Sequence, residues 1–264
     1  MSGVRNRHED RDVYAFVKNA MLALLLGVVA LPALAQSSGD LTSLLAAVDA
    51  TRNAFEEAII SARATQVVGG KEASGADFDV YVQGRDRGLI VFRGGRNGGR
   101  KVLTNGDRMW LLVPGSTHPV PITANQRLLG GASFGDVARL RFSEDYSAKA
   151  TGERETIGGR DCLVLELTAK LPKLTFPRVL LSVNEREKTP CRVRFFLASG
   201  KEARAVTFTK FRQLAGKTVV AEMEVRELLG SASASGVVTR LEYRDYRKAR
   251  LDPRIFTPDG ARGL

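Results

Sequence analysis

Histidine, cysteine and tryptophan are scarce in this chain of 264 residues, which holds two histidines, two cysteines and one tryptophan. Zinc sites are built mainly from Cys and His ligands, and serine hydrolases need a histidine base. His8 falls in the N-terminal leader described below, so His118 is the one histidine left for such chemistry. We therefore expect no metal site, no cofactor and no enzymatic activity.

One catalytic pattern does occur in the sequence. Residues 131–135 read G-x-S-x-G around Ser133, which is the nucleophile-elbow pattern of α/β-hydrolases. Those enzymes supply their histidine after the serine, whereas His118 precedes Ser133. We interpret Ser133 instead as the N-cap of a short helix, because Ser133 and Asp136 are spaced as in a capping box before an apolar stretch.

Long apolar runs are also rare. The run Met21–Leu31 is shorter than the roughly 20 residues that a membrane-spanning helix needs. Lys18 precedes it and Ala33-Leu34-Ala35 follows it, in the order expected for a signal peptide and its cleavage site. We predict that residues 1–35 are a cleaved signal peptide and that residues 36–264 form a single periplasmic domain. Since no cysteine follows the cleavage site directly, a lipid anchor is not expected.

Acidic residues are outnumbered by basic ones, and the net charge is +11. Without the four basic and three acidic residues of the leader, 36 Lys and Arg face 26 Asp and Glu, a net charge of +10. This excess favours peripheral contact with anionic membrane surfaces, although basic residues scattered over outward strand faces would give the same count. No Lys/Arg-rich block and no aromatic stacking platform is present, so we expect no nucleic-acid partner.

The first half of the chain predicts one helix followed by an antiparallel meander. Ser38 or Asp40 can cap a helix whose apolar residues, from Leu41 to Phe55, recur at helical spacing. Short strand patterns follow, separated by glycine-rich turns, with Asn105-Gly106 as a strong hairpin signal. The expected strands are Glu57–Val68, Phe78–Gln83, Gly88–Phe92, Lys101–Thr104 and Met109–Val113.

The second half predicts strands that alternate between apolar and polar residues, so that a long sheet has one continuous apolar face. The predicted inward residues include Leu163, Leu165 and Leu167, and likewise Val219, Met223 and Val225. About ten such strands must curl around their apolar face or be covered, and two short helices are the candidates for the cover. A barrel of this size tends to keep a cavity, whereas two sheets packed face to face would be solid. Both arrangements remain open at this point.

Met109–Val113 differs from most other strand patterns because it is apolar on both faces and contains the one tryptophan, Trp110. Such a strand is covered on both sides in a folded protein. We expect either a lid of the same chain or a bound apolar molecule to lie across it.

Cys162 and Cys191 could form a disulfide, which an exported protein favours. If their strands flank the strand near Val183, however, they lie about 9 to 10 Å apart, which is too far for a bridge. Both possibilities stay open.

The order of these features resembles the outer-membrane lipoprotein-sorting protein family, with its LolA/LolB-like fold. The segments that carry the resemblance are Asp107–Pro114, Leu129–Phe134 with Asp136, Asp145-Tyr146, Gly159–Cys162, the stretch after Pro190, Leu241–Tyr246 and Ile255–Thr257. The resemblance implies a half-open antiparallel β-barrel with a helical lid over an apolar cavity that accepts acyl chains. The lack of a lipidated cysteine suggests a soluble shuttle.

We therefore expect a periplasmic carrier that binds a lipid or the acyl chains of a lipoprotein and shuttles it between envelope membranes, in contact with an inner-membrane transporter. The alternative is a non-catalytic periplasmic adaptor or subunit of an envelope transporter complex. Alternation along the strands selects the candidate ligand-binding side chains Trp110, Leu112, Leu165, Leu181, Phe195 and Phe208.

Overall fold

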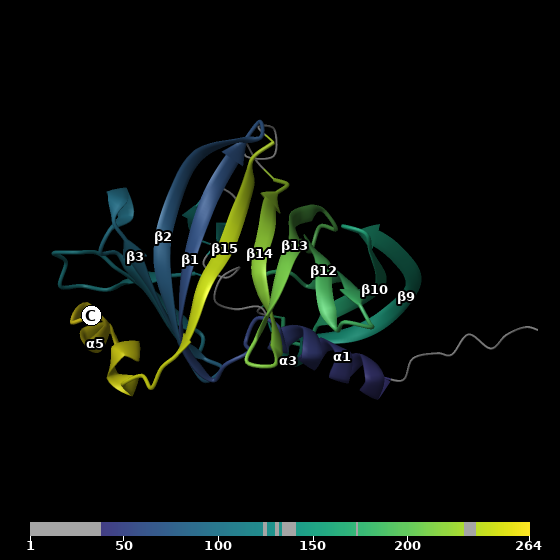
Figure 1. The fold of residues 1–264 in the computed structure, drawn as a ribbon, viewed down its shortest axis with the longest axis horizontal. Helices are drawn as coiled ribbons and strands as arrows, with labels where there is room; N and C mark the ends of the chain where they lie inside the picture. Colours follow the sequence, from purple (N-terminus) through teal and green to yellow (C-terminus); the bar gives the residue numbers. More distant parts are fainter. Residues whose placement is uncertain (1–37, 124–125, 130–131, 134–140, 173, 230–235) are drawn as a thin grey trace, which may run out of the picture. The chain divides into compact units, whose positions relative to one another are not determined.

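A single antiparallel sheet of thirteen strands dominates the computed structural model of the chain (Figure 1). The structure describes residues 38–123, 126–129, 132–133, 141–172, 174–229 and 236–264. The predicted signal peptide and residues 134–140 of the predicted second helix lie outside the described residues. The sheet is open, and the predicted half-open, mainly β architecture is confirmed, with thirteen strands in place of about ten.

The sheet consists of two meanders that meet in its middle. Strands β1 to β6 run outward in chain order to one edge, and β9 to β15 run from the other edge back to the middle, where β15 pairs with β1. The first meander contains β1 (Glu57–Val68), β2 (Lys71–Gln83), β3 (Arg87–Arg93), β4 (Lys101–Asn105), β5 (Arg108–Leu112) and β6 (Val120–Ile122), with the 3-10 turn η1 (Gly95–Asn97) between β3 and β4. The second contains β9 (Tyr146–Ile157), β10 (Arg160–Ala169), β11 (Arg178–Asn184), β12 (Thr189–Phe196), β13 (Glu202–Leu214), β14 (Lys217–Glu227) and β15 (Val238–Lys248).

The chain passes from one edge of the sheet to the other between β6 and β9. This crossing contains a separate two-stranded sheet, β7 (Arg127–Leu129) with β8 (Ala132–Ser133), and the one-turn helix α3 (Phe142–Asp145). Strand β7 lies against β1, and β8 lies against β14. Ser133 is thus in a strand, and the residues that would continue a helix from it lie outside the described residues.

The main core lies on the apolar face that alternation predicts. Leu165, Leu181, Val193 and Phe208 are buried in one cluster that extends from β1 to β15. Val219 is buried but lies outside this cluster, and Val220 takes its place. The reason is an irregularity in the pairing of β13 with β14 near Lys210, which shifts the alternation of inward and outward residues by one.

Helix α1 (Ser38–Ala50) covers part of this face, as its apolar periodicity predicts. Leu41, Leu45 and Val48 are buried in the main core, and the helix packs against β9, β12 and α3. The side chain of Asp49 accepts hydrogen bonds from the backbone nitrogens of Phe142 and Ser143, at 3.0 and 2.9 Å. These bonds satisfy the first amides of α3, so the end of α1 and the start of α3 are joined.

A C-terminal segment that the sequence pattern did not predict covers the opposite face of the first meander. It contains the 3-10 turn η2 (Pro253–Phe256) and the short helix α5 (Pro258–Arg262). Asp252 and Thr257 cap them through bonds to Arg254 N and Gly260 N. Leu251, Phe256 and Ala261 form a second core cluster with outward-facing residues of β2 to β5. Among the helices of the described residues, none is long and apolar enough to cross a membrane.

The two apolar faces of β5 are therefore both covered by the same chain. Met109 and Leu111 pack into the main core, whereas Trp110 and Leu112 pack into the second cluster beneath the C-terminal segment. Three polar side chains of the sheet hold that segment in place: Lys101, Asn105 and Gln83 donate to the carbonyl oxygens of Ala261, Phe256 and Leu251.

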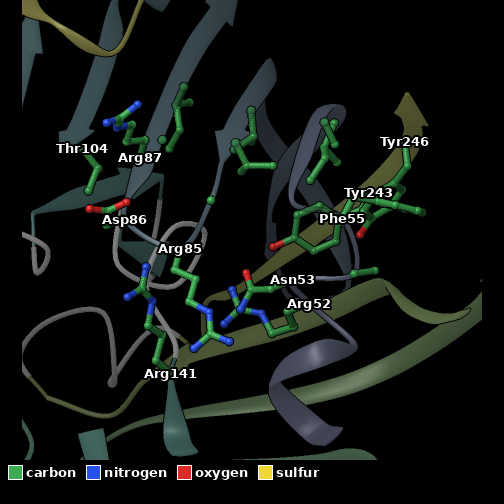
Figure 2. Close-up of a pocket in the computed structure, with 18 of the residues that line it drawn as sticks. Arg52, Asn53, Phe55, Arg85, Asp86, Arg87, Thr104, Arg141, Tyr243 and Tyr246 are labelled. Atoms are coloured by element: carbon green, nitrogen blue, oxygen red, sulfur yellow. The ribbon is translucent and has the colours of Figure 1, made fainter. Parts of the chain in front are cut away.

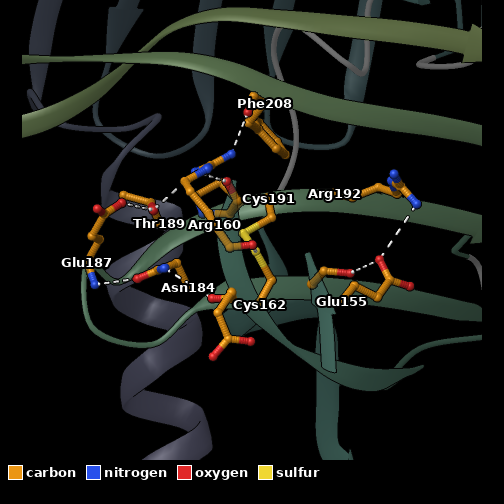
Figure 3. Close-up of a disulfide and its surroundings, with 12 residues drawn as sticks. Glu155, Arg160, Cys162, Asn184, Glu187, Thr189, Cys191, Arg192 and Phe208 are labelled. Atoms are coloured by element: carbon orange, nitrogen blue, oxygen red, sulfur yellow. Dashed lines mark hydrogen bonds and ion pairs between the residues drawn. A yellow bond between two sulfur atoms is a disulfide. The ribbon is translucent and has the colours of Figure 1, made fainter. Parts of the chain in front are cut away.

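Cys162 and Cys191 form a disulfide whose Cα atoms are 6.6 Å apart (Figure 3). Their strands do flank β11, but the expected spacing of two strands does not apply here. Cys162 lies just before Leu163, where the pairing of β10 with β11 begins, and Cys191 is skipped in the pairing of β11 with β12. This irregularity lies beside the first pair of β10 with β11, Leu163 with Val183, where the two cysteines come together.

Candidate functional site

A half-enclosed pocket of about 340 Å³ opens at one end of the apolar face of the sheet (Figure 2). Its volume lies near the lower end of the range of small-molecule sites. The pocket is formed by β1 to β4, by β14 and β15 in the middle of the sheet, by the loop after α1, and by Arg141 before α3.

The deep wall of the pocket is apolar. It is lined by inward-facing side chains of neighbouring strands, namely Ala58, Ile60, Val80, Val82, Ile90 and Val220. Gly88 and Thr104 face the same space from β3 and β4, where they are paired with each other. Gly88 has no side chain, so this pair leaves room that a larger residue would fill.

Two tyrosines and a phenylalanine close one side of the pocket. The ring centroids of Phe55 and Tyr246 are 6.4 Å apart, and so are those of Tyr243 and Tyr246. The hydroxyl of Tyr246 donates to the backbone oxygen of Val220 at 2.8 Å. Burial raises the pKa of Tyr246, so this hydroxyl keeps its proton at neutral pH and acts as a fixed donor to β14.

The rim of the pocket is rich in arginine. Arg52, Arg85, Arg87 and Arg141 line it together with Asp86 and Asp107. Figure 2 shows Arg52, Arg85 and Arg141 on the same side of the opening. Arg85 and Arg141 both donate to the carboxylate of Glu144, at 2.6 and 3.2 Å. The site thus combines an apolar interior with a positively charged rim.

The six side chains predicted to bind a ligand are divided between two places. Leu165, Leu181, Phe195 and Phe208 lie together in the main core, and each is almost fully buried. Trp110 and Leu112 lie on the other face of the sheet, against the C-terminal segment. None of the six lines the pocket.

Sequence reasoning missed the residues that do line the pocket. Ile60, Val80 and Ile90 carry the same alternation signal as the chosen residues, but this signal does not tell which part of an apolar face stays unfilled. Arg52, Arg85 and Arg141 of the rim come from three connections far apart in the chain, so only the folded sheet brings them together.

The described residues contain no group of three or more His, Cys, Asp or Glu side chains that could hold a metal ion. The carboxylate of Glu144, beside the rim, accepts hydrogen bonds from Arg85 and Arg141. The arrangement is therefore suited to bind an apolar group beside an anion.

Solved structures of other proteins share this fold. A LolA superfamily protein from Nitrosomonas europaea is 25% identical, covers 83% of this chain and 97% of its own, and superposes with a TM-score of 0.72. A DUF1329 family protein from Desulfovibrio piger is 20% identical, with 83% and 96% covered and a TM-score of 0.71. A domain assigned to the outer membrane lipoprotein-sorting proteins from Vibrio parahaemolyticus is 16% identical, with 86% and 100% covered and a TM-score of 0.71.

The sequence comparisons complete this result. No curated protein matches the sequence well enough to count as a relative. A family model described as that of an uncharacterized protein matches residues 84–260, which is more than half of the chain. The predicted resemblance to the lipoprotein-sorting proteins is confirmed at the level of the LolA-like fold. The chain belongs to the family of that model and has the fold of the LolA superfamily.

Proposed function

We propose that this protein is a periplasmic carrier that binds the acyl chain of a lipid or lipoprotein and shuttles it between envelope membranes, without catalysing a reaction. The observation that carries the proposal is the pocket of about 340 Å³, apolar inside and open at its rim. The LolA-like fold, seen also in a protein assigned to lipoprotein sorting, supports it.

Export from the cytoplasm is part of the proposal. The signal-peptide pattern of residues 1–35 directs the chain to the periplasm, and the disulfide between Cys162 and Cys191 suits an oxidising compartment. An inner-membrane transporter is the proposed source of the ligand, and the net positive charge favours contact with anionic membranes.

The energetics of chain burial fit a carrier. Each methylene removed from water contributes about 0.8 kcal/mol, so a chain of about twelve contributes roughly 10 kcal/mol. Association costs about 4 to 15 kcal/mol, so at the lower end of this range chain burial leaves a moderate and reversible affinity. A carrier needs such an affinity, because it must release the chain to an acceptor.

The binding role of the six residues selected from the sequence stays a prediction. Leu165, Leu181, Phe195 and Phe208 belong to the same apolar face as the pocket wall, so a long chain could reach them if α1 moved away. Trp110 and Leu112 would need the C-terminal segment to move. The pocket wall around Ile60 and Val80 is the proposed first contact.

A neutral alkyl probe tests the proposal directly. Dodecyl maltoside has one chain and no charge, so isothermal titration with the mature protein measures insertion of the chain alone. We expect saturable binding of one dodecyl maltoside molecule per protein molecule. In parallel, protein purified from the periplasm and extracted for mass spectrometry should carry lipid.

Replacing Gly88 provides the matched variant series. The Cβ of a side chain at this position would meet Thr104 Cβ at 3.8 Å and Tyr81 O at 3.9 Å, which are ordinary contacts. Gly88→Ala should reduce probe binding slightly and Gly88→Leu strongly, while the protein stays folded. Equal binding by all three proteins, or no binding by the wild type, would contradict the carrier function and leave the non-catalytic adaptor as the better description.

A further inference from the structure

The charged residues at the pocket rim indicate the chemistry of the ligand's headgroup, which the apolar wall does not. Four arginines and two aspartates line the pocket, and the three arginines on one side, Arg52, Arg85 and Arg141, belong to separate connections of the fold (Figure 2). Arg52 follows α1, Arg85 lies in the turn between β2 and β3, and Arg141 precedes α3. We infer that these three side chains form a site for the acidic headgroup of a lipid whose acyl chain occupies the pocket.

Glu144 positions two of the three arginines by accepting hydrogen bonds from them. Its Oε1 accepts from Nη1 of Arg85 at 2.6 Å, and its Oε2 accepts from Nη1 of Arg141 at 3.2 Å. One carboxylate is thus shared by two guanidinium groups, each of which has five N–H donors. The contact holds the two arginines near each other and uses one Nη atom of each.

The bond between Arg85 and Glu144 is a surface ion pair that a ligand can replace. The side chain of Arg85 is 82% exposed, and exposed ion pairs contribute little to stability. Guanidinium groups bind phosphate and carboxylate oxygens with two parallel hydrogen bonds. A phosphate bound between Arg52, Arg85 and Arg141 can therefore form more hydrogen bonds with arginine than the carboxylate of Glu144 does.

The apolar wall of the pocket indicates that the bound anionic group is part of a lipid. Ile60, Val80 and Val82 lie behind the rim in the same pocket, so a molecule with one apolar chain and one acidic head fits both parts at once. A free phosphate would leave the apolar wall in water. This inference rests on the proposed carrier function and adds the charge of the headgroup to it.

Alkyl probes of equal chain length and different headgroups test the inference. Dodecyl phosphate, dodecyl maltoside and dodecyl trimethylammonium are titrated against the mature protein at low ionic strength. We expect dodecyl phosphate to bind at least tenfold more tightly than the maltoside, and the ammonium probe to bind most weakly. Added salt should reduce only the advantage of the phosphate probe.

The variant Arg85→Gln/Arg141→Gln should lose the preference for phosphate and keep its affinity for the maltoside. Arg254→Gln is the matched control, because Arg254 is 86% exposed, pairs with Asp252 at 2.6 Å in the C-terminal segment and does not line the pocket. This control should bind all probes as the wild type does. Glu144→Gln removes the competing carboxylate and should strengthen binding of dodecyl phosphate severalfold, which tests the site in the opposite direction if the double variant does not fold.

The other outcomes are distinct. If the maltoside and the phosphate probe bind equally to the wild type, the headgroup site is refuted while the carrier function stands. If no probe binds, the carrier function fails as well. If millimolar inorganic phosphate displaces dodecyl phosphate completely, the rim binds a free anion, and the assignment to a lipid is wrong.

Discussion

The ammonium group of Lys101 donates a hydrogen bond to the backbone oxygen of Ala261 at 2.8 Å and so joins β4 to the last helix of the chain. A second bond reaches the oxygen of Arg262 at 3.1 Å. Both carbonyls lie at the C-terminal end of α5, where backbone oxygens lack helical partners and a positive charge is favourable. The lysine thus fastens the segment that covers Trp110.

Lys101→Met removes these donors and keeps most of the apolar length of the side chain. We expect the free energy of unfolding to fall by about 1 to 3 kcal/mol, because the buried carbonyl of Ala261 and the partly buried carbonyl of Arg262 lose their charged partner. Trp110 fluorescence should shift to longer wavelength as the C-terminal segment loosens. Lys71→Met, at the exposed start of β2, is the control and should change neither quantity. A wild-type spectrum for Lys101→Met would mean that the apolar packing of the segment and the hydrogen bonds from Asn105 and Gln83 hold it without the lysine.

Replacing both Cys162 and Cys191 by alanine should destabilise the protein. The bridge spans 29 positions, for which the chain-entropy description gives roughly 3 to 4 kcal/mol. Urea unfolding of the oxidised protein, the reduced protein and the double variant measures the difference. Intact-mass analysis of the protein purified without reductant must also show a gain of two hydrogen atoms on reduction; no gain would show that the thiols are free.

The stability of the contact between α1 and α3 should depend on pH through Asp49. Burial raises the pKa of Asp49 above its ordinary value of 3.8, and the hydrogen bonds from Ser143 and Phe142 oppose this only in part. A raised pKa means that the folded protein binds the proton more tightly than the unfolded chain does. The stability that Asp49 contributes to the folded protein is therefore fully present below about pH 3.8, and it is lost as the pH rises through the raised pKa.

Asp49→Asn mimics the protonated side chain at every pH. Relative to the wild type, the variant should gain stability as the pH is raised from about 4 to about 7. Urea unfolding of both proteins at several pH values measures this difference in stability. The other carboxylates affect both proteins equally, so their effects cancel in the difference. A constant difference over the range would show that Asp49 titrates equally in the folded and unfolded states.

Leu181→Ala tests whether the predicted acyl contacts in the main core take part in binding. Leu181 is fully buried, so we expect a loss of about 2 to 5 kcal/mol in the free energy of unfolding. Maltosides with short and long chains separate the two roles, because only a long chain extends beyond the pocket toward β11. Weaker binding of the long chain alone would support contact with Leu181, and equal effects on both would place Leu181 in the core only.

Alternation along the strands predicted the apolar face well, because a half-buried sheet imposes a period of two on its residues. Leu165, Leu181 and Phe208 all lie where their spacing places them. The edge strand β9 was missed because most of its residues are exposed and carry no such period. Val219 was misplaced because the irregularity near Lys210 changes the register, and the spacing of apolar residues does not reveal it.

The double apolar face of β5 predicted a cover on each side but not its origin. Asp252-Pro253 and Thr257-Pro258 are capping signals that could have identified the C-terminal helices. The pocket itself was beyond sequence reasoning. Its arginines and its unfilled space at Gly88 arise from the pairing of strands distant in the chain, which composition and period do not specify.

The pairing of β1 with β15 joins the first and the last strand of the described residues in the middle of the sheet. Each meander can form from neighbouring hairpins, but the two halves meet only when the final strand has arrived. A chain that crosses a membrane from its N-terminus must therefore leave β1 with an unpaired edge until translocation is almost complete, a period in which an unpaired strand is exposed to aggregation. The residues from β15 (Val238–Lys248) onward thus decide when the edge of β1 is covered, and under the proposed export a C-terminal truncation should lower the yield of exported protein before it alters any binding property.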